Sequence, residues 1–318
     1  MTYFKFIVLM LFFFLQYPSV FPQSTGQSGE LLRYGIGAKE IALGSSFMAA
    51  DGSASSVYWN PAGLDGCSKF TAAVSHTNLF LDSSFDFLGV SYSYTKATFG
   101  VGIVQLQSAG FEQRTSRNEK GDKFSLYQRA LLASVSYRFS SHIRVGLTVK
   151  HMCSGIGLEN TSEYQETLYD LGTIIDISDK ISLGCAVQNI SDRSFSEISY
   201  INSSFTVPPN FRIGGTGSGL LNSIKNWDFF FDLNTFFPVS TKDPYNASLG
   251  AEYTWNVKSE TKICFRFSYG NRYLCAGLGL TTPLPRLTID ATWQLPLHKK
   301  NDHLGIPLWI GMTFSSMK

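Results

Sequence analysis

Apolar and polar side chains alternate with a period of two residues along most of the chain from about residue 69 onward. Since successive side chains of a β-strand point to opposite faces, each alternating run has one apolar face and one small or polar face. The clearest run is the last, where Leu304, Ile306, Leu308, Ile310, Met312 and Phe314 alternate with other residues. The pattern predicts fourteen strands, near 69–76, 85–94, 97–106, 127–138, 143–152, 169–177, 181–189, 210–216, 226–234, 246–255, 261–269, 273–281, 286–294 and 304–314.

The connections between the predicted strands alternate in length. Those at 95–96, 139–142 and 178–180 are short, whereas those at 107–126, 153–168 and 190–209 are long and polar. Short turns at one end and long loops at the other are typical of outer-membrane barrels, whose turns face the periplasm. The chain is therefore predicted to be all-β, a transmembrane antiparallel β-barrel of about 14 strands in the cell outer membrane.

A soluble β-sandwich would also alternate apolar and polar residues. Here, however, the polar face carries glycines and charges of both signs, as a wet barrel lumen would. Aromatic residues gather at the ends of the runs, where interfacial girdles lie in membrane barrels; they are Tyr92, Tyr94, Tyr137, Tyr253, Trp255 and Trp293. Both features favour the barrel.

The N-terminus has the pattern of an export signal. Lys5 precedes an apolar stretch from Phe6 to Leu15, which is too short to span a membrane as a helix, and a polar stretch containing proline follows. Residues 1–23 are therefore predicted to be a cleaved signal peptide, the alternative being an N-terminal anchor. The formal net charge of +2 offers no electrostatic case for binding nucleic acid.

Residues 24–66 differ from the rest in being small, glycine-rich and weakly charged, with turn signals at Asp51-Gly52 and Asn60-Pro61. Fourteen strands enclose a lumen too wide for side chains alone to fill. We therefore expect 24–66 to form a hatch, or plug, inside the lumen, with the barrel over 67–318. The hatch motif Asn60, Pro61, Ala62, Gly63 and Leu64 is expected to anchor it to the wall, the alternative being an ordinary turn before the first strand.

Three short segments resemble a known N-terminal signature, that of the PorV/PorQ family of outer-membrane barrels. They are Ala42-Leu43-Gly44, Ala50-Asp51-Gly52-Ser53-Ala54 and Tyr58-Trp59-Asn60-Pro61-Ala62-Gly63-Leu64. That family is itself similar to the FadL-like long-chain fatty-acid transporters, which share the Asn-Pro-Ala motif.

The resemblance implies two functions and leaves a third open. A PorV-like protein would be an accessory component of the type IX secretion system, binding the C-terminal signal domains of exported cargo and docking on the large translocon barrel. A FadL-like protein would be a channel for hydrophobic small molecules, and a purely structural barrel in outer-membrane lipid would have no ligand. The lumen-facing positions are mostly Gly, Ser, Thr and charged residues, which favours partner binding over a hydrophobic path.

The long loops at 107–126, 153–168, 190–209 and 235–246 are the predicted docking surface. Aromatic residues supply much of the binding energy at protein interfaces, although loops that dip into the membrane would explain them too. The candidates are Phe111, Phe124, Tyr164, Tyr200, Phe205, Phe236 and Phe237.

No catalytic or cofactor-binding motif is found in the sequence, so we expect no enzyme activity, no cofactor and no metal. The five cysteines include no CxxC pair. Alternation places Cys264 and Cys275 on the same face of two successive strands, which would allow a disulfide between them.

Overall fold

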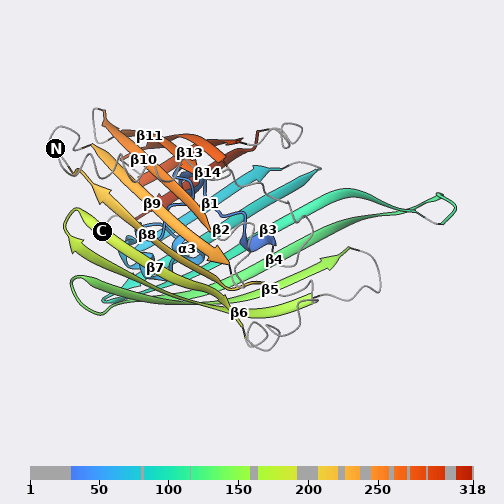
Figure 1. Cartoon of the computed structure of the whole chain (residues 1–318), viewed down its shortest axis with the longest axis horizontal. Helices are drawn as coiled ribbons and strands as arrows, with labels where there is room; N and C mark the ends of the chain where they lie inside the picture. The colour runs from blue at the N-terminus through green and yellow to red at the C-terminus, as the bar shows by residue number, and fades with distance from the viewer. Residues whose placement is uncertain are drawn as a thin grey trace.

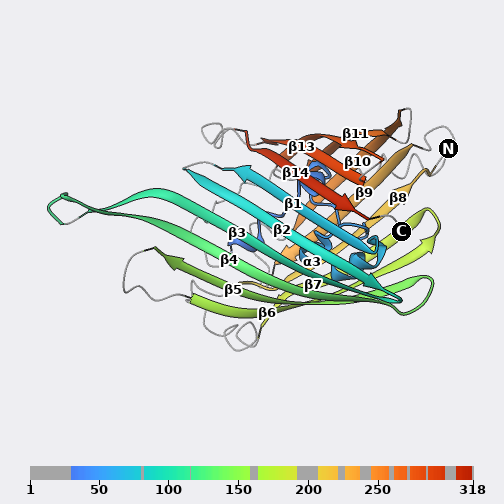
Figure 2. The same ribbon diagram turned by 180° about the vertical axis from the view of Figure 1, so that it is seen from behind.

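In the computed structural model, fourteen antiparallel strands form one closed barrel (Figures 1 and 2). The structure describes residues 30–79, 82–114, 116–157, 164–191, 207–220, 226–236, 245–257, 261–270, 273–283, 286–297 and 306–316. Each strand pairs with its neighbours in sequence, and β1 (Phe70–Asn78) pairs with β14 (Leu308–Ser315) to close the sheet. The predicted fold class and strand number are confirmed.

The other strands follow the predicted order. They are β2 (Ser83–Tyr94), β3 (Ala97–Arg114), β4 (Lys120–Arg138), β5 (Ile143–Ile156), β6 (Tyr164–Ser178), β7 (Ile181–Ile190), β8 (Asn210–Ser218), β9 (Trp227–Phe236), β10 (Asn246–Asn256), β11 (Lys262–Gly270), β12 (Tyr273–Thr281) and β13 (Arg286–Pro296). Between residue 30 and the first strand the structure has four short helical elements: η1 (Glu30–Leu32), α2 (Ala38–Ala42), α3 (Ser56–Trp59) and η2 (Pro61–Gly66). Among the described residues, no helix is both long and apolar enough to cross a bilayer.

The outer surface of the barrel is an apolar belt. Leu88, Val101 and Leu131 are each more than half exposed because they point away from the lumen. Tyr92, Tyr94 and Tyr137 lie exposed near the end of the barrel that carries the turns 95–96 and 139–142, as an interfacial girdle does. A closed barrel with such a belt is the form in which β-proteins span the bacterial outer membrane. The chain is an outer-membrane barrel.

Two predicted loops are partly strand. Residues 107–114 and 120–126 belong to β3 and β4, which form a hairpin that extends well beyond the other strands (Figure 1). Residues 153–156 and 164–168 likewise belong to β5 and β6. These stretches lack the regular apolar alternation that marks a membrane strand, although their backbone pairing continues. The predicted signal peptide and residues 24–29 lie outside the described residues.

The disulfide that alternation would allow between Cys264 and Cys275 is not formed. Both side chains are buried on the same face, as alternation requires, but both thiols are free. Cys264 is opposite Gly279 and Cys275 is opposite Ser268. An offset of four residues along paired strands corresponds to about 13 Å, well beyond the reach of a disulfide.

Candidate functional site in the barrel lumen

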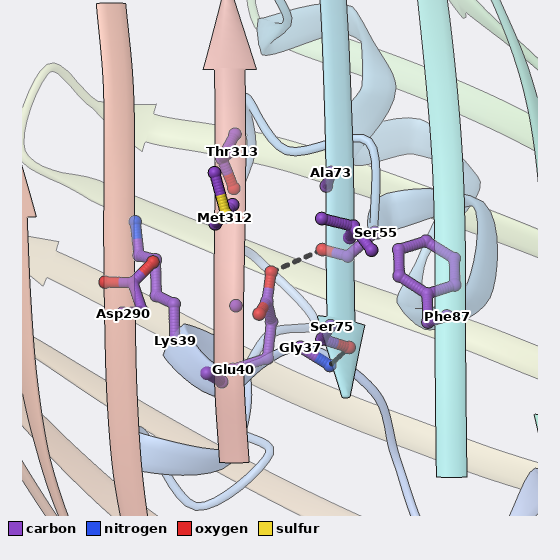
Figure 3. Close-up of a pocket in the computed structure, with 13 residues that line it drawn as sticks. Gly37, Lys39, Glu40, Ser55, Ala73, Ser75, Phe87, Asp290, Met312 and Thr313 are labelled. Carbon is purple, nitrogen blue, oxygen red and sulfur yellow. Dashed lines mark hydrogen bonds between the residues drawn. The ribbon is translucent and has the colours of Figure 1, made fainter. Parts of the chain in front are cut away.

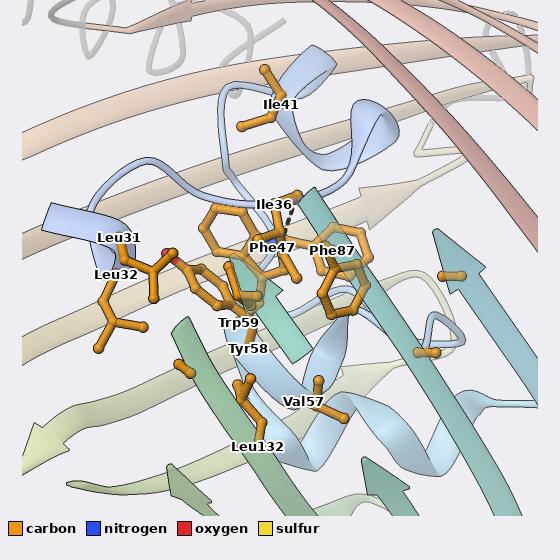
Figure 4. Close-up of a cluster of buried hydrophobic side chains, with 14 of the residues drawn as sticks. Leu31, Leu32, Ile36, Ile41, Phe47, Val57, Tyr58, Trp59, Phe87 and Leu132 are labelled. Carbon is orange, nitrogen blue, oxygen red and sulfur yellow. Dashed lines mark hydrogen bonds between the residues drawn. The ribbon is translucent and has the colours of Figure 1, made fainter. Parts of the chain in front are cut away.

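Residues 30–67 pack against the inward side of the barrel wall (Figures 1 and 4). Thr292 Oγ1 on β13 donates to the carbonyl of Ala38 over 2.6 Å, and Ser136 Oγ on β4 donates to the carbonyl of Ala62 over 3.1 Å. Gln188 Nε2 on β7 donates to the carbonyls of Tyr58 and Trp59. Wall side chains from well-separated strands thus satisfy the backbone of this N-terminal segment.

The Asn60 motif lies at the start of η2. Asn60 Oδ1 accepts from the backbone N–H of Ala62 over 3.1 Å, which caps the short helix, and Pro61 occupies its first position, where no N–H is required. Asn60 Nδ2 donates to the carbonyl of Met48 over 2.7 Å and to the carbonyl of Thr173 on β6 over 3.2 Å. The Asn60 amide therefore joins two parts of the N-terminal segment to the wall.

Glycines on the inward face of the wall make room for this backbone. A Cβ added at Gly146 on β5 would meet the backbone N of Ala62 at 2.5 Å, and one at Gly250 on β10 would meet the carbonyl of Leu43 at 2.6 Å. Separations under 3.0 Å are not tolerated by real Cβ atoms. The glycines of the polar face, predicted to face a wet lumen, thus allow the wall and the segment to pack closely.

Ion pairs add charge to these contacts. Arg144 on β5 bridges Asp51 of the segment and Asp176 on β6, and Arg138 Nη2 lies 2.8 Å from Asp65 of η2. Arg212 on β8 donates to the carbonyl of Ser45 over 2.8 Å and lies over the ring of Trp59 at 4.8 Å (its partner on the wall is Asp232). The basic side chains of the wall therefore hold acidic, carbonyl and aromatic groups of the segment.

A small cavity of about 10 Å³ lies between α2 and strands β1, β13 and β14 (Figure 3). Glu40 on its border accepts from Ser53 and Ser55, and burial raises the pKa of the Glu40 carboxyl. The charge of Glu252 raises the pKa of Lys39. The volume is about that of one water molecule. Within the described residues, no group of His, Cys, Asp and Glu could hold a metal ion.

Toward the end of the barrel opposite the turns, the lumen is apolar (Figure 4). Wall residues that point inward here pack on Leu31, Leu32 and Ile36 of the segment. They are Phe85, Phe87, Val104, Leu132, Met152, Leu168 and Trp309, each at most 2% exposed. Aromatic rings are prominent, with Phe85 5.7 Å from Trp309 and 5.8 Å from Tyr34 between ring centroids. We call these seven wall residues the apolar layer.

The apolar layer corrects the prediction of a polar lumen face. On β2 the faces exchange character: Phe85 and Phe87 point inward, whereas Asp86 points outward and pairs with His76 on β1 at 2.6 Å. Sequence reasoning assigned every apolar run to the outer belt. The sequence Phe85-Asp86-Phe87 could have predicted this exchange. Its two aromatic residues share one face of the strand and the charged residue lies on the other, so the apolar face here is the one that points into the lumen.

The predicted loop aromatics that the structure describes do not form a single cluster. Phe111 and Phe124 are neighbours in the β3–β4 hairpin, with rings stacked at 5.5 Å. Tyr164 begins β6 and donates to Glu166 over 2.7 Å, while its ring packs against the buried apolar cluster of the lumen. Phe236 ends β9 opposite Asn210. Tyr200, Phe205 and Phe237 lie outside the described residues, and partner binding by these aromatics stays a prediction.

The closed barrel and its apolar belt define an outer-membrane β-barrel, and residues 30–67 pack against the inner side of its wall. No protein-family model matches the chain, and no curated protein matches its sequence. Its fold is nevertheless shared with solved structures. The toluene transporter TbuX of Ralstonia pickettii matches with a TM-score of 0.64 and 14% identity, covering 89% of this chain and 99% of that chain.

Two further structures share the fold. The CymD monoaromatic hydrocarbon channel matches with a TM-score of 0.62 and 10% identity, covering 89% of this chain and 98% of that chain. A FadL homologue of Pseudomonas aeruginosa matches with a TM-score of 0.50 and 12% identity, covering 84% and 94%. At these identities the likeness establishes the fold alone. Of the two families that the sequence resembles, the matched structures include a homologue of FadL. No comparison supports the PorV/PorQ assignment or a type IX secretion role.

Proposed function

We propose that this barrel is an outer-membrane channel for small hydrophobic molecules. The observation that carries the proposal is the apolar layer, in which inward-facing Phe85, Leu132 and Trp309 line the lumen toward the loop end. A hydrophobic solute gains roughly 25 cal/mol for each Å² of apolar surface that leaves water. A lumen built for ions or sugars would carry polar groups at this level. The fold shared with a toluene transporter and a hydrocarbon channel supports the same direction.

The N-terminal segment would act in this channel as a hatch. It packs on the apolar layer and covers it, and Asn60, Arg144 and Arg212 hold it to the wall. The cavity beside Glu40 holds about one water molecule. A solute the size of toluene therefore crosses the part of the lumen that the segment occupies only when the segment shifts. The hydrogen bonds and ion pairs between segment and wall would then regulate transport.

The secretion role has no comparable support. The loop residues predicted to bind cargo or translocon lie partly in strands and partly outside the described residues. The FadL-like alternative uses residues that the structure brings together, so it replaces the accessory role as the proposed function.

The test is uptake of radiolabelled toluene by cells whose outer membrane lacks other hydrocarbon channels. We expect the chain to accelerate uptake, and Met152→Gln, which places an amide of similar size in the apolar layer, to reduce that gain several-fold. His151→Gln, at the neighbouring outward-facing position, is the matched control and should leave uptake unchanged. Toluene entry no faster than in cells with no barrel, at equal levels of folded protein, would overturn the proposal.

A second measurement tests the hatch. Deleting residues 30–60 should raise ion conductance in planar bilayers, because the wall alone encloses a wide lumen. Unchanged conductance in a variant that still folds would show that the segment does not close the lumen. Recovery of a translocon barrel or of cargo with the purified intact protein would restore the secretion role.

A further inference from the structure

A separate cavity of about 300 Å³ opens at the turn end of the barrel, beside η2 and the β2–β3 turn. It lies away from the apolar layer, and its walls are polar. The lining residues come from η2, the entry to β1, strands β2 to β4 and the turn: Asp65, Cys67, Lys69, Ser93, Thr95, Thr98 and Arg138. Its volume is at the lower limit of small-molecule sites, roughly 300–1,000 Å³.

The charge of this cavity is positive. Arg138 is paired with Asp65, with 2.8 Å between Nη2 and Oδ2 and a second bond from Nε. Lys69 is exposed, and within the part of the chain that the structure describes no hydrogen bond or ion pair is found for its ammonium group. Burial raises the pKa of Cys67 to about 11, so this thiol is neutral at physiological pH. One cationic group is thus left to receive an anion.

Hydroxyl groups lie on the same walls. Thr98 Oγ1 donates to Ser93 Oγ over 3.0 Å, and Ser93 Oγ donates to the carbonyl of Ser68 over 3.2 Å, so these two are oriented by the protein. Thr95 lies in the turn with φ of 53°, a left-handed conformation that is rare for a β-branched residue. Thr95 and Lys96 form the two-residue turn of the β2–β3 hairpin, and such turns require a positive φ at their first residue. In this turn the conformation brings the Thr95 side chain to the cavity.

We infer that this cavity binds an organic oxyanion, the carboxylate of a small acid, between the Lys69 ammonium and the Thr95 hydroxyl. Charge-assisted hydrogen bonds from an ammonium group to a carboxylate are among the stronger polar contacts in proteins. The paired Arg138 and Asp65 form the opposite wall without adding net charge. The inference does not rest on the proposed function, since the site would bind its anion whether or not the lumen conducts hydrocarbons.

The experiment uses the full-length exported protein in detergent and follows 4-fluorobenzoate by fluorine NMR. We expect saturable binding, weakened about tenfold by Lys69→Gln, as the loss of one charge-assisted hydrogen bond implies, and largely retained by Lys69→Arg. Lys96→Gln is the matched control, since it removes a cation from the same turn at a residue that does not line the cavity. The neutral analogue 4-fluorobenzamide should bind far more weakly.

Three results would overturn the inference. They are equal binding of the amide, an equal loss of affinity in Lys96→Gln, and the absence of saturable fluorobenzoate binding by folded protein. Competition by inorganic phosphate distinguishes the source of the anion. Displacement supports an oxyanion site that also accepts phosphate headgroups, and failure to displace supports a site restricted to carboxylates.

Discussion

Asn60 Oδ1 occupies the space that a side chain at position 172 would need, so Asn60 and Gly172 fit together only because residue 172 is glycine. The same amide donates to the carbonyl of Thr173, the next residue of β6. The cap of η2 and the inner face of β6 are thus complementary surfaces. Changes on the wall should therefore act on the N-terminal segment.

Gly172→Ala should displace the segment. The new methyl group would overlap the Asn60 carboxamide, and overpacking of this kind costs typically about 1–3 kcal/mol. We expect a lower temperature for the gel-shift unfolding transition and a higher single-channel conductance. Gly270→Ala on β11 is the control, because a Cβ there makes ordinary contacts at 3.4 Å. Equal effects of the two substitutions would contradict the assigned fit.

Arg266→Met should destabilise the barrel strongly. Arg266 is 2% exposed and bonds both Glu252 and Asp290, so its removal leaves two buried carboxylates without their partner. Breaking a buried ion pair costs about 3–5 kcal/mol. Urea unfolding in detergent measures the loss. Adding Glu252→Gln and Asp290→Asn to Arg266→Met should restore part of it, and no restoration would mean that packing, not charge, is the cause.

An exposed ion pair gives the comparison for that substitution. Arg114→Met, on the β3–β4 hairpin, breaks the contact with Glu112, where solvent screens the charges and a change within about 1 kcal/mol is expected. A loss equal to that of Arg266→Met would contradict the distinction between the two environments.

Glu40 should make stability depend on pH. Burial raises its pKa above the ordinary value of 4.5, so the native state holds the proton at higher pH than the unfolded chain does. The contribution of Glu40 to the unfolding free energy is therefore largest below about pH 4.5 and falls as pH rises through the folded pKa. Glu40→Gln cannot ionise, and we expect it to reduce this fall and to be at least as stable at neutral pH.

Urea midpoints at pH 4.5 and pH 8 test this expectation. Glu112→Gln, on the hairpin far from the lumen, should keep the pH dependence of the wild type. If wild type and Glu40→Gln lose stability equally between the two pH values, the buried carboxyl is not the source.

All five cysteines should be alkylated in denaturant without a reductant, because every thiol is free and Cys264 is four residues out of register with Cys275. In the folded protein Cys67 should react slowly, since it is buried and burial raises its pKa to about 11. Intact mass after alkylation counts the thiols. A mass short by two adducts would indicate a disulfide.

The strands of the wall were predictable from sequence because one physical constraint governs them all. A residue that faces lipid is apolar and its neighbour faces the lumen, so runs such as Ile143, Val145, Leu147 and Val149 repeat with a period of two. The register follows, and β5 pairs with β6 from Ile143 opposite Ile175 onward.

The lumen was less predictable because both faces of a strand can be apolar. Leu131 faces lipid whereas Leu132 points inward and belongs to the apolar layer, although both are leucines in successive positions. The partners of the wall charges were also hidden, since Arg144 meets Asp51 from a segment without periodic pattern. The cavity beside Lys69 and Thr95 is lined by residues from Asp65 to Arg138, and the alternation of single strands does not show which of them meet.

The pairing of β1 with β14 has a consequence for assembly. Thr71 lies opposite Ser315, so the barrel closes through its first and last strands, and contacts so distant in sequence form late and slowly. Residues 30–67 are joined directly to β1, one of the two strands of this seam. The seam therefore fixes the point at which the N-terminal segment enters the wall, so a change in the β1–β14 pairing should also displace the segment.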